Sequence, residues 1–163
     1  MFRERIEKML GQGYIGICKT GFAYLREGRY TEALELFDQA IAANPRYTDA
    51  YMGKGKCRIK QGEHEAALQC FEQVLEMDAH NLDAAFERGL CQIRMGRIRE
   101  ATQSFDAVLA INPDYDLAWD NKAVCYQLLG ERVKAVQCVR TGMVMRGEFQ
   151  TYQPLMGKWY SSR

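Results

Sequence analysis

A thirteen-residue segment recurs along this chain at intervals of 34 residues. Its copies begin at Gly28, Gly62, Gly96 and, with more substitutions, Gly130. Each copy has an alanine five residues after its glycine, and the first three have a phenylalanine nine residues after it: Ala33, Ala67, Ala101 and Ala135, then Phe37, Phe71, Phe105 and, in the fourth copy, Val139. A fixed period of this length predicts a solenoid, in which each unit buries its apolar face against the next unit.

The period divides most of the chain into four repeats, which we place at residues 14–47, 48–81, 82–115 and 116–149. In the first repeat the pattern predicts helices over residues 14–27 and 31–43, separated by a turn at Gly28, because glycine readily follows a helix end. Asn44-Pro45 ends the second helix, since proline cannot continue it. Asn112-Pro113 repeats this signal, whereas Met77-Asp78-Ala79 replaces it between the second and third repeats. The predicted fold class is therefore all-α, a solenoid of helix-turn-helix repeats.

The two ends of the chain lie outside the repeats. Residues 1–13 are predicted to be an N-terminal helical cap, with an amphipathic helix over residues 2–10. Residues 150–163 form an apolar tail that contains Tyr152, Leu155, Met156, Trp159 and Tyr160. The tail has two interpretations: it is a cap over the exposed face of the fourth repeat, or it is an anchor that docks on another molecule.

Charge and composition disfavour several classes of function. The net charge is +1, from 22 basic and 21 acidic residues, so no basic stripe indicates a nucleic-acid or membrane-surface binder. A local cluster of Arg94, Arg97 and Arg99 keeps RNA binding as a third, weaker hypothesis. No apolar run of 18 residues occurs, and the N-terminus lacks the apolar core of a signal peptide.

The six cysteines contain no Cys-x-x-Cys pair, and three of them, Cys57, Cys91 and Cys125, share one position of the repeat. Equivalent positions in neighbouring repeats are about 10 Å apart, which is too far for a disulfide. We expect packed, reduced thiols in a cytoplasmic protein. His64 and His80 do not supply convergent ligands for a metal, and no nucleophile, phosphate-binding loop or cofactor motif appears. We therefore expect no enzyme activity, metal or cofactor.

The repeat resembles the tetratricopeptide repeat family. The first repeat carries its pattern at Ile17, Gly21, Tyr24, Ala33, Phe37, Ala40 and Pro45, and the later repeats follow with more substitutions. The resemblance implies a right-handed superhelix in which the first helices of the pairs line a concave groove. It also implies that a partner's peptide or helix binds there.

The periodicity places candidate groove residues on one side of each first helix. They are Cys18, Lys19, Phe22, Met52, Lys56, Asp83, Phe86, Glu87, Leu90, Asp120, Asn121 and Val124. Their apolar members predict an exposed stripe that binds an apolar segment. The alternative is that the register is displaced by one residue and these side chains belong to the core. The lysines at one end and the carboxylates toward the other would orient a ligand.

Some members of this family hold acidic C-termini in a clamp of lysines, asparagines and an arginine. In repeats one to three the matching positions are Cys18, Phe22, Gly53, Asp83 and Glu87, and in repeats two to four they are Met52, Lys56, Glu87, Leu117 and Asn121. Neither set suits a carboxylate, so we predict no such clamp. Two functions remain open: a scaffold that binds a partner segment in the groove, and a homo-oligomer in which the tail docks on a neighbouring chain.

Overall fold

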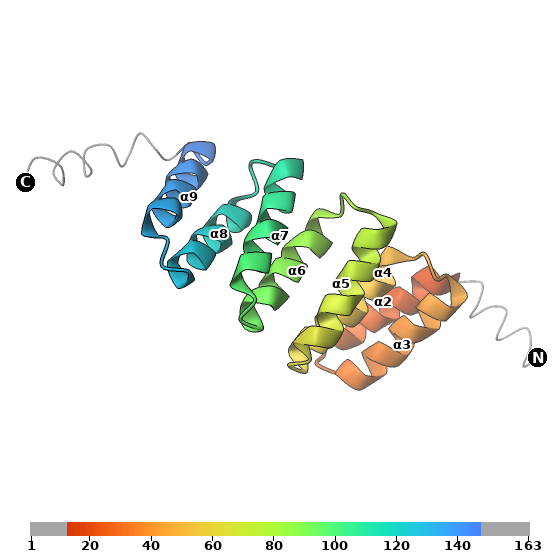
Figure 1. The fold of residues 1–163 in the computed structure, drawn as a ribbon. Coiled ribbons are helices and arrows are strands. Elements are labelled where there is room, and N and C mark those ends of the chain that lie inside the picture. The colour runs from red at the N-terminus through yellow and green to blue at the C-terminus, as the bar shows by residue number, and fades with distance from the viewer. Residues whose placement is uncertain (1–12, 148–163) are drawn as a thin grey trace, which may run out of the picture.

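The computed structural model describes residues 13–147, and every regular element in this part of the chain is an α-helix (Figure 1). The helices are α2 (Gly13–Arg26), α3 (Tyr30–Ala43), α4 (Thr48–Lys60), α5 (His64–Met77), α6 (Leu82–Arg94), α7 (Ile98–Ile111), α8 (Asp116–Leu128) and α9 (Arg132–Met145). In the first repeat, the bounds of α2 and α3 agree to within one residue with the helices predicted over residues 14–27 and 31–43. The predicted cap over residues 1–13, except for Gly13 at the start of α2, and the predicted tail over residues 150–163 lie outside the described residues.

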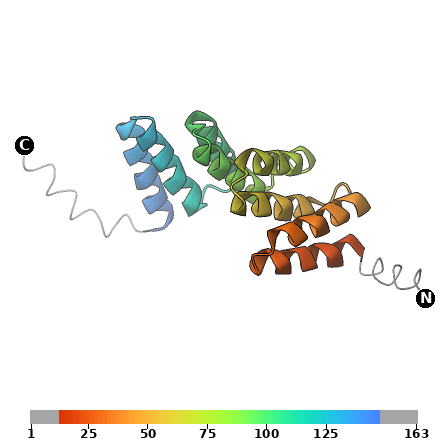
Figure 2. The ribbon, with the colours of Figure 1, turned by 90° about the horizontal axis from the view of Figure 1, so that it is seen from below.

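The helices form four consecutive antiparallel pairs, α2–α3, α4–α5, α6–α7 and α8–α9. Each second helix also packs against the first helix of the next pair, as α3 does on α4. Figures 1 and 2 show the pairs in a row in chain order, with α2 and α9 at opposite ends of the row. The predicted all-α solenoid is confirmed.

Glycines make the turn inside every pair, as predicted. Gly28, Gly62, Gly96 and Gly130 have φ between +75° and +80°. This left-handed conformation is costly for residues that carry a Cβ. The 34-residue spacing of the glycines therefore sets where each first helix ends.

The loops between pairs depend on an asparagine or aspartate rather than on proline. The side chains of Asn44, Asp78 and Asn112 each accept a hydrogen bond, 3.1 Å long, from the backbone N–H two residues later. Such Asx turns hold a short loop without help from proline, which explains why the loop at Asp78 matches the other two. Arg146 stands at the fourth equivalent position and caps α9 with helical backbone angles, and Gly147 follows with φ +71°.

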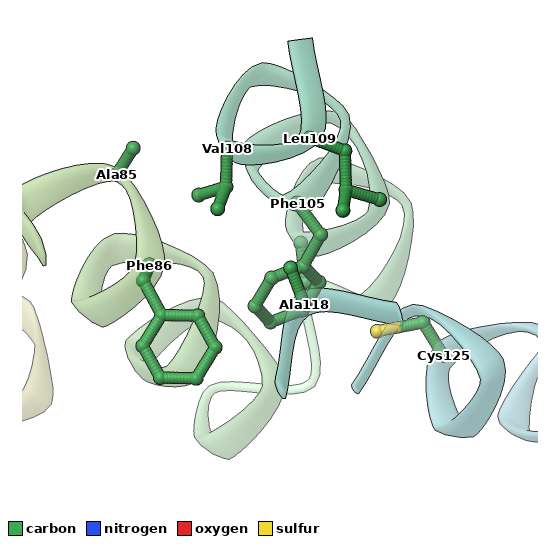
Figure 3. Packing of buried hydrophobic residues seen from close by; sticks show 8 residues of the cluster. Ala85, Phe86, Phe105, Val108, Leu109, Ala118 and Cys125 are labelled. Carbon is green, nitrogen blue, oxygen red and sulfur yellow. The ribbon is translucent and has the colours of Figure 1, made fainter. Parts of the chain in front are cut away.

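The core consists of three clusters, each of which joins the second helix of one repeat to the first helix of the next. Phe37 packs with Ala50 and Cys57 in the first cluster. Phe71 packs with Ala84 and Cys91 in the second, and Phe105 packs with Ala118 and Cys125 in the third (Figure 3). All six cysteines are free and buried, so the predicted packed thiols are confirmed.

Candidate functional site

The first helices do not present the continuous apolar stripe that the periodicity predicted. Cys18, Met52 and Phe86 are buried in the core clusters. Figure 3 shows the ring of Phe86 beside Phe105, and the ring centroids lie 5.7 Å apart. These three positions are core because each first helix turns them toward a second helix, a rotation that helix spacing alone does not determine.

Two further members of the predicted stripe are half-buried. Phe22 contacts Phe37 edge-on, with ring centroids 5.0 Å apart, and therefore packs against the edge of the first cluster. Leu90 packs against the third cluster. The alternative interpretation, in which apolar members of the stripe are core, thus describes the first three repeats better than the exposed stripe does.

Among the first helices, the exposed large apolar side chains lie mainly on α8, with Ile15 on α2 as the other example in the described residues. Leu117, Val124 and Leu128 expose 55%, 44% and 60% of their surface. Their spacings of seven and four residues place them on one face of the helix. Leu128 was not among the predicted residues, although it follows Val124 by four positions and that spacing was the available signal. We call these three residues the α8 patch.

Charged side chains occupy most of the equivalent positions on α4 and α6: Asp49, Lys56 and Lys60 on α4, and Asp83 and Arg94 on α6, where Leu90 matches Val124. Glu87 of α6 is half-buried, and burial raises the pKa of its carboxyl group. Lys56 of α4 and Arg94 of α6 oppose this rise through their positive charge, while Asp83 adds to it. The nearby Tyr115 also has a raised pKa, first through burial and then through Asp83 and Glu87. The predicted residues Lys56, Asp83 and Glu87 therefore do lie in one electrostatic neighbourhood.

A basic edge runs along the C-terminal ends of three first helices. Arg26, Lys60 and Arg94 occupy one position of the repeat, each in the last turn of its helix, and all three are exposed. Cations at a helix C-terminus are favoured by the negative end of the helix dipole. Leu128 takes this position on α8, so the basic edge ends at the α8 patch. None of these three cations was among the predicted groove residues, although Arg94 belongs to the basic cluster considered for RNA binding.

The remaining predicted residues have varied surroundings. Lys19 is exposed on α2. Asp120 pairs with Arg146 across a distance of 3.5 Å, and the Asn121 side-chain amide donates to the Leu117 carbonyl at 2.7 Å. Both α8 polar groups are therefore engaged within the α8–α9 pair.

A cavity lies elsewhere, on α9 and the end of α8. It has a volume of about 540 Å³ and is lined by Gln127, Arg132, Ala135, Val136, Val139, Arg140 and Met143. Within residues 13–147, no group of three or more histidine, cysteine or carboxylate side chains is arranged to hold a metal ion. None of the described helices is both long and apolar enough to cross a lipid bilayer.

Comparison with known proteins identifies the repeat. The family model described as tetratricopeptide repeat matches residues 24–85 and 58–123, which together cover more than half of the chain. The chain belongs to the tetratricopeptide repeat family. The resemblance that the sequence pattern suggested is thus confirmed. Among curated proteins, no sequence matches this chain significantly.

Several solved tetratricopeptide structures share the fold. MamA superposes with a TM-score of 0.81 at 19% identity, over 91% of this chain and 87% of MamA. YrrB, described as having an unusual peptide-binding site, gives 0.73 at 23% identity, over 86% of this chain and 72% of YrrB. The first such domain of Spaghetti (RPAP3), bound to the HSP90 peptide SRMEEVD, gives 0.71 at 18% identity, over 73% and 94%. At these identities the likeness establishes the fold alone.

Proposed function

We propose that this tetratricopeptide protein is a non-catalytic scaffold that binds one segment of a partner protein along the face formed by its first helices. The observation that carries this proposal is the α8 patch, whose three apolar side chains are about half exposed in the described structure. A soluble protein seldom leaves several large apolar groups together on one helix face without a partner. Two structural neighbours described as binding peptides support the same function.

The charges on this face favour a segment that is apolar at one end and acidic at the other. Its apolar side chains would contact Leu117, Val124 and Leu128. Its acidic part would follow the basic edge from Arg94 to Lys60 and Arg26. Charges of this kind set the orientation and the association rate more than the affinity. We therefore expect the α8 patch to determine how tightly the segment binds, and the basic edge to determine which way the segment runs.

We further propose that the face is not a clamp for a C-terminal carboxylate. In the first set of clamp positions, Cys18 and Gly53 are buried and offer no donor side chain. Asp83 and Glu87 of that set are acidic and would repel a carboxylate. In the second set Met52 is buried and Leu117 is apolar. The six buried, unpaired cysteines support a reducing compartment such as the cytoplasm.

A screen of displayed peptides against the whole chain tests the function, and isolated peptides then serve as the probe. We expect Val124→Asp and Leu128→Asp each to weaken binding at least tenfold, which corresponds to about 1.4 kcal/mol. Val144→Asp is the matched control, because Val144 is also exposed but lies on α9. Lys60→Glu should slow association, with less effect on dissociation. Peptides that bind all four variants equally would refute this placement of the site.

A further inference from the structure

The outward face of α9 differs from the same face of the other second helices. Leu34, Leu68 and Thr102 occupy one position of the repeat and are buried. Leu34 and Leu68 lie in clusters with alanine and cysteine side chains from the next first helix. Val136 occupies this position on α9 and is 60% exposed. Within the described residues, α9 therefore presents the surface that a following first helix covers elsewhere.

The 540 Å³ cavity marks the same surface. Val136, Val139 and Met143, which line it, stand at the positions of Leu68, Phe71 and Leu75 on α5. On α5 all three of these side chains belong to, or pack against, a core cluster. The cavity is thus an unfilled equivalent of the interface between consecutive repeats, with Arg132 and Arg140 at its edge.

The chain beyond Gly147 continues the 34-residue register. The first helices α4, α6 and α8 begin at residues 48, 82 and 116, so the next step falls on residue 150. Phe149 stands where Tyr47 and Tyr115 stand in earlier repeats. Gly157 matches Gly21, Gly55 and Gly89, and Tyr160 matches Tyr24 and Tyr126. Four residues, 146–149, would link α9 to this segment, as four residues link the earlier pairs.

Where α9 would meet the segment after Gly147, large and small residues change places relative to the earlier junctions between repeats. In each described cluster a phenylalanine of the second helix meets an alanine and a cysteine of the next first helix. On α9 the phenylalanine becomes Val139, while the alanine and cysteine positions become Tyr152 and Trp159. A large residue on the segment thus replaces a small one where α9 has lost a large one. The two larger side chains of the segment exceed the volume that α9 loses, and the cavity of about 540 Å³ provides space for the excess.

We propose that the segment of residues 149–160 docks on the α9 face of its own chain, with Trp159 filling the cavity against Val136 and Val139. Pro154 suits the first turn of a helix, so the docked helix begins there rather than at residue 150. The eight residues 146–153 span up to about 26 Å at ~3.3 Å each, which is enough to return along α9. Because the segment is tethered beside its site, its effective concentration exceeds that of a second copy.

The docked segment closes the solenoid at its C-terminal end. An open α9 face would accept the first helix of another array, and end-to-end stacking of that kind propagates without limit. The inference does not depend on the partner-binding face, since the α8 patch and the α9 cavity are lined by different residues.

Tryptophan fluorescence of the whole chain tests the inference, because the chain has two tryptophans and Trp119→Phe leaves Trp159 as the reporter. We expect Trp159 to be shielded from acrylamide, and Val136→Asp to raise its quenching constant to that of the urea-unfolded chain. Val133→Asp is the matched control, since Val133 is exposed on α9 at a position held by Arg99 and Glu65 in other repeats. It should leave Trp159 shielded.

Molar mass by light scattering completes the design. Shielding that persists on dilution, in a monomer, supports docking within one chain. Shielding that is lost on dilution together with a fall in molar mass would overturn it in favour of a second copy. Equal quenching in the parent, Val136→Asp and Val133→Asp chains would overturn docking on α9 altogether. Thermal unfolding followed by circular dichroism gives a second readout, in which Val136→Asp lowers the midpoint and Val133→Asp does not.

Discussion

Gly53 of α4 lies directly against the ring of Phe37 on α3. A Cβ atom placed on Gly53 would come within 2.3 Å of the Phe37 Cε1 and Cζ atoms. Phe37 is fully buried and also contacts α2, where a Cβ at Gly21 would lie 2.8 Å from its Cε1 atom. One aromatic ring thus sets the distance between a second helix and the first helices on both sides of it.

This contact predicts that Gly53→Ala destabilises the fold. Alanine favours a helix over glycine by about 1 kcal/mol, but overpacking a filled core costs about 1–3 kcal/mol. We expect the clash to prevail, because Phe37 is held on both sides. Urea unfolding measures the change, and Gln39→Ala on the exposed side of α3 should fall within about 0.5 kcal/mol of the parent. A more stable Gly53→Ala chain would show that the ring can move.

The loop between the second and third repeats predicts a role for Asp78. Its carboxylate accepts a hydrogen bond from the His80 backbone N–H at 3.1 Å. Asp78→Ala removes this acceptor and should lower the free energy of unfolding by about 1 kcal/mol. Asp78→Asn keeps an acceptor, as Asn44 and Asn112 do in the equivalent loops, and should retain most of the stability. Chemical denaturation of both variants measures the two free energies of unfolding. An equal loss of stability in Asp78→Ala and Asp78→Asn would contradict the role of the Asp78 side chain as a hydrogen-bond acceptor.

The buried cysteines predict a loss of stability at alkaline pH. Burial raises the pKa of Cys57, Cys91 and Cys125 to about 11, from an ordinary value of 9.0. Above pH 9 the unfolded chain releases these protons while the folded chain keeps them, so stability falls as pH rises toward 11. Unfolding free energies at pH 8 and pH 10 measure the fall, which should be smaller in Cys125→Ala. An unchanged pH dependence in that variant would oppose the burial argument.

The thiols should also be unreactive in the folded protein, since the thiolate is the nucleophile. We expect labelling at pH 8 to proceed only as fast as the helices open.

Glu87 predicts a pH effect in the acid range. Burial raises the pKa of its carboxyl group above the ordinary value of 4.5. The folded state therefore favours the protonated form, and the stability that this form provides is lost as pH rises through the raised pKa. Glu87→Gln should increase stability at pH 7 and change it little at low pH. The exposed Glu35 provides a control in Glu35→Gln, and a destabilised Glu87→Gln chain at pH 7 would mean that Lys56 and Arg94 outweigh burial.

The candidate site was only partly accessible to sequence reasoning. Asp83 and Glu87 share a face of α6 because they are four residues apart, and Lys56 of α4 is close enough to lower the pKa of Glu87. Cys18, Met52 and Phe86 were expected on the same face and are core. The difference is a rotation of the first helix about its own axis, which depends on how it crosses its neighbours. Local periodicity carries no information about that crossing.

The sequence by itself determined the helices, their turns and their order. These features follow from local chemistry: glycine at each left-handed turn, asparagine or aspartate in each loop, and a period of 34 residues that repeats one packing unit. The tertiary structure alone decided which faces remain exposed. Val136 and Leu68 occupy the same position of the repeat, yet Leu68 is 4% exposed and Val136 is 60% exposed. Burial is a property of what packs against a residue, and α9 has no following helix within the described chain.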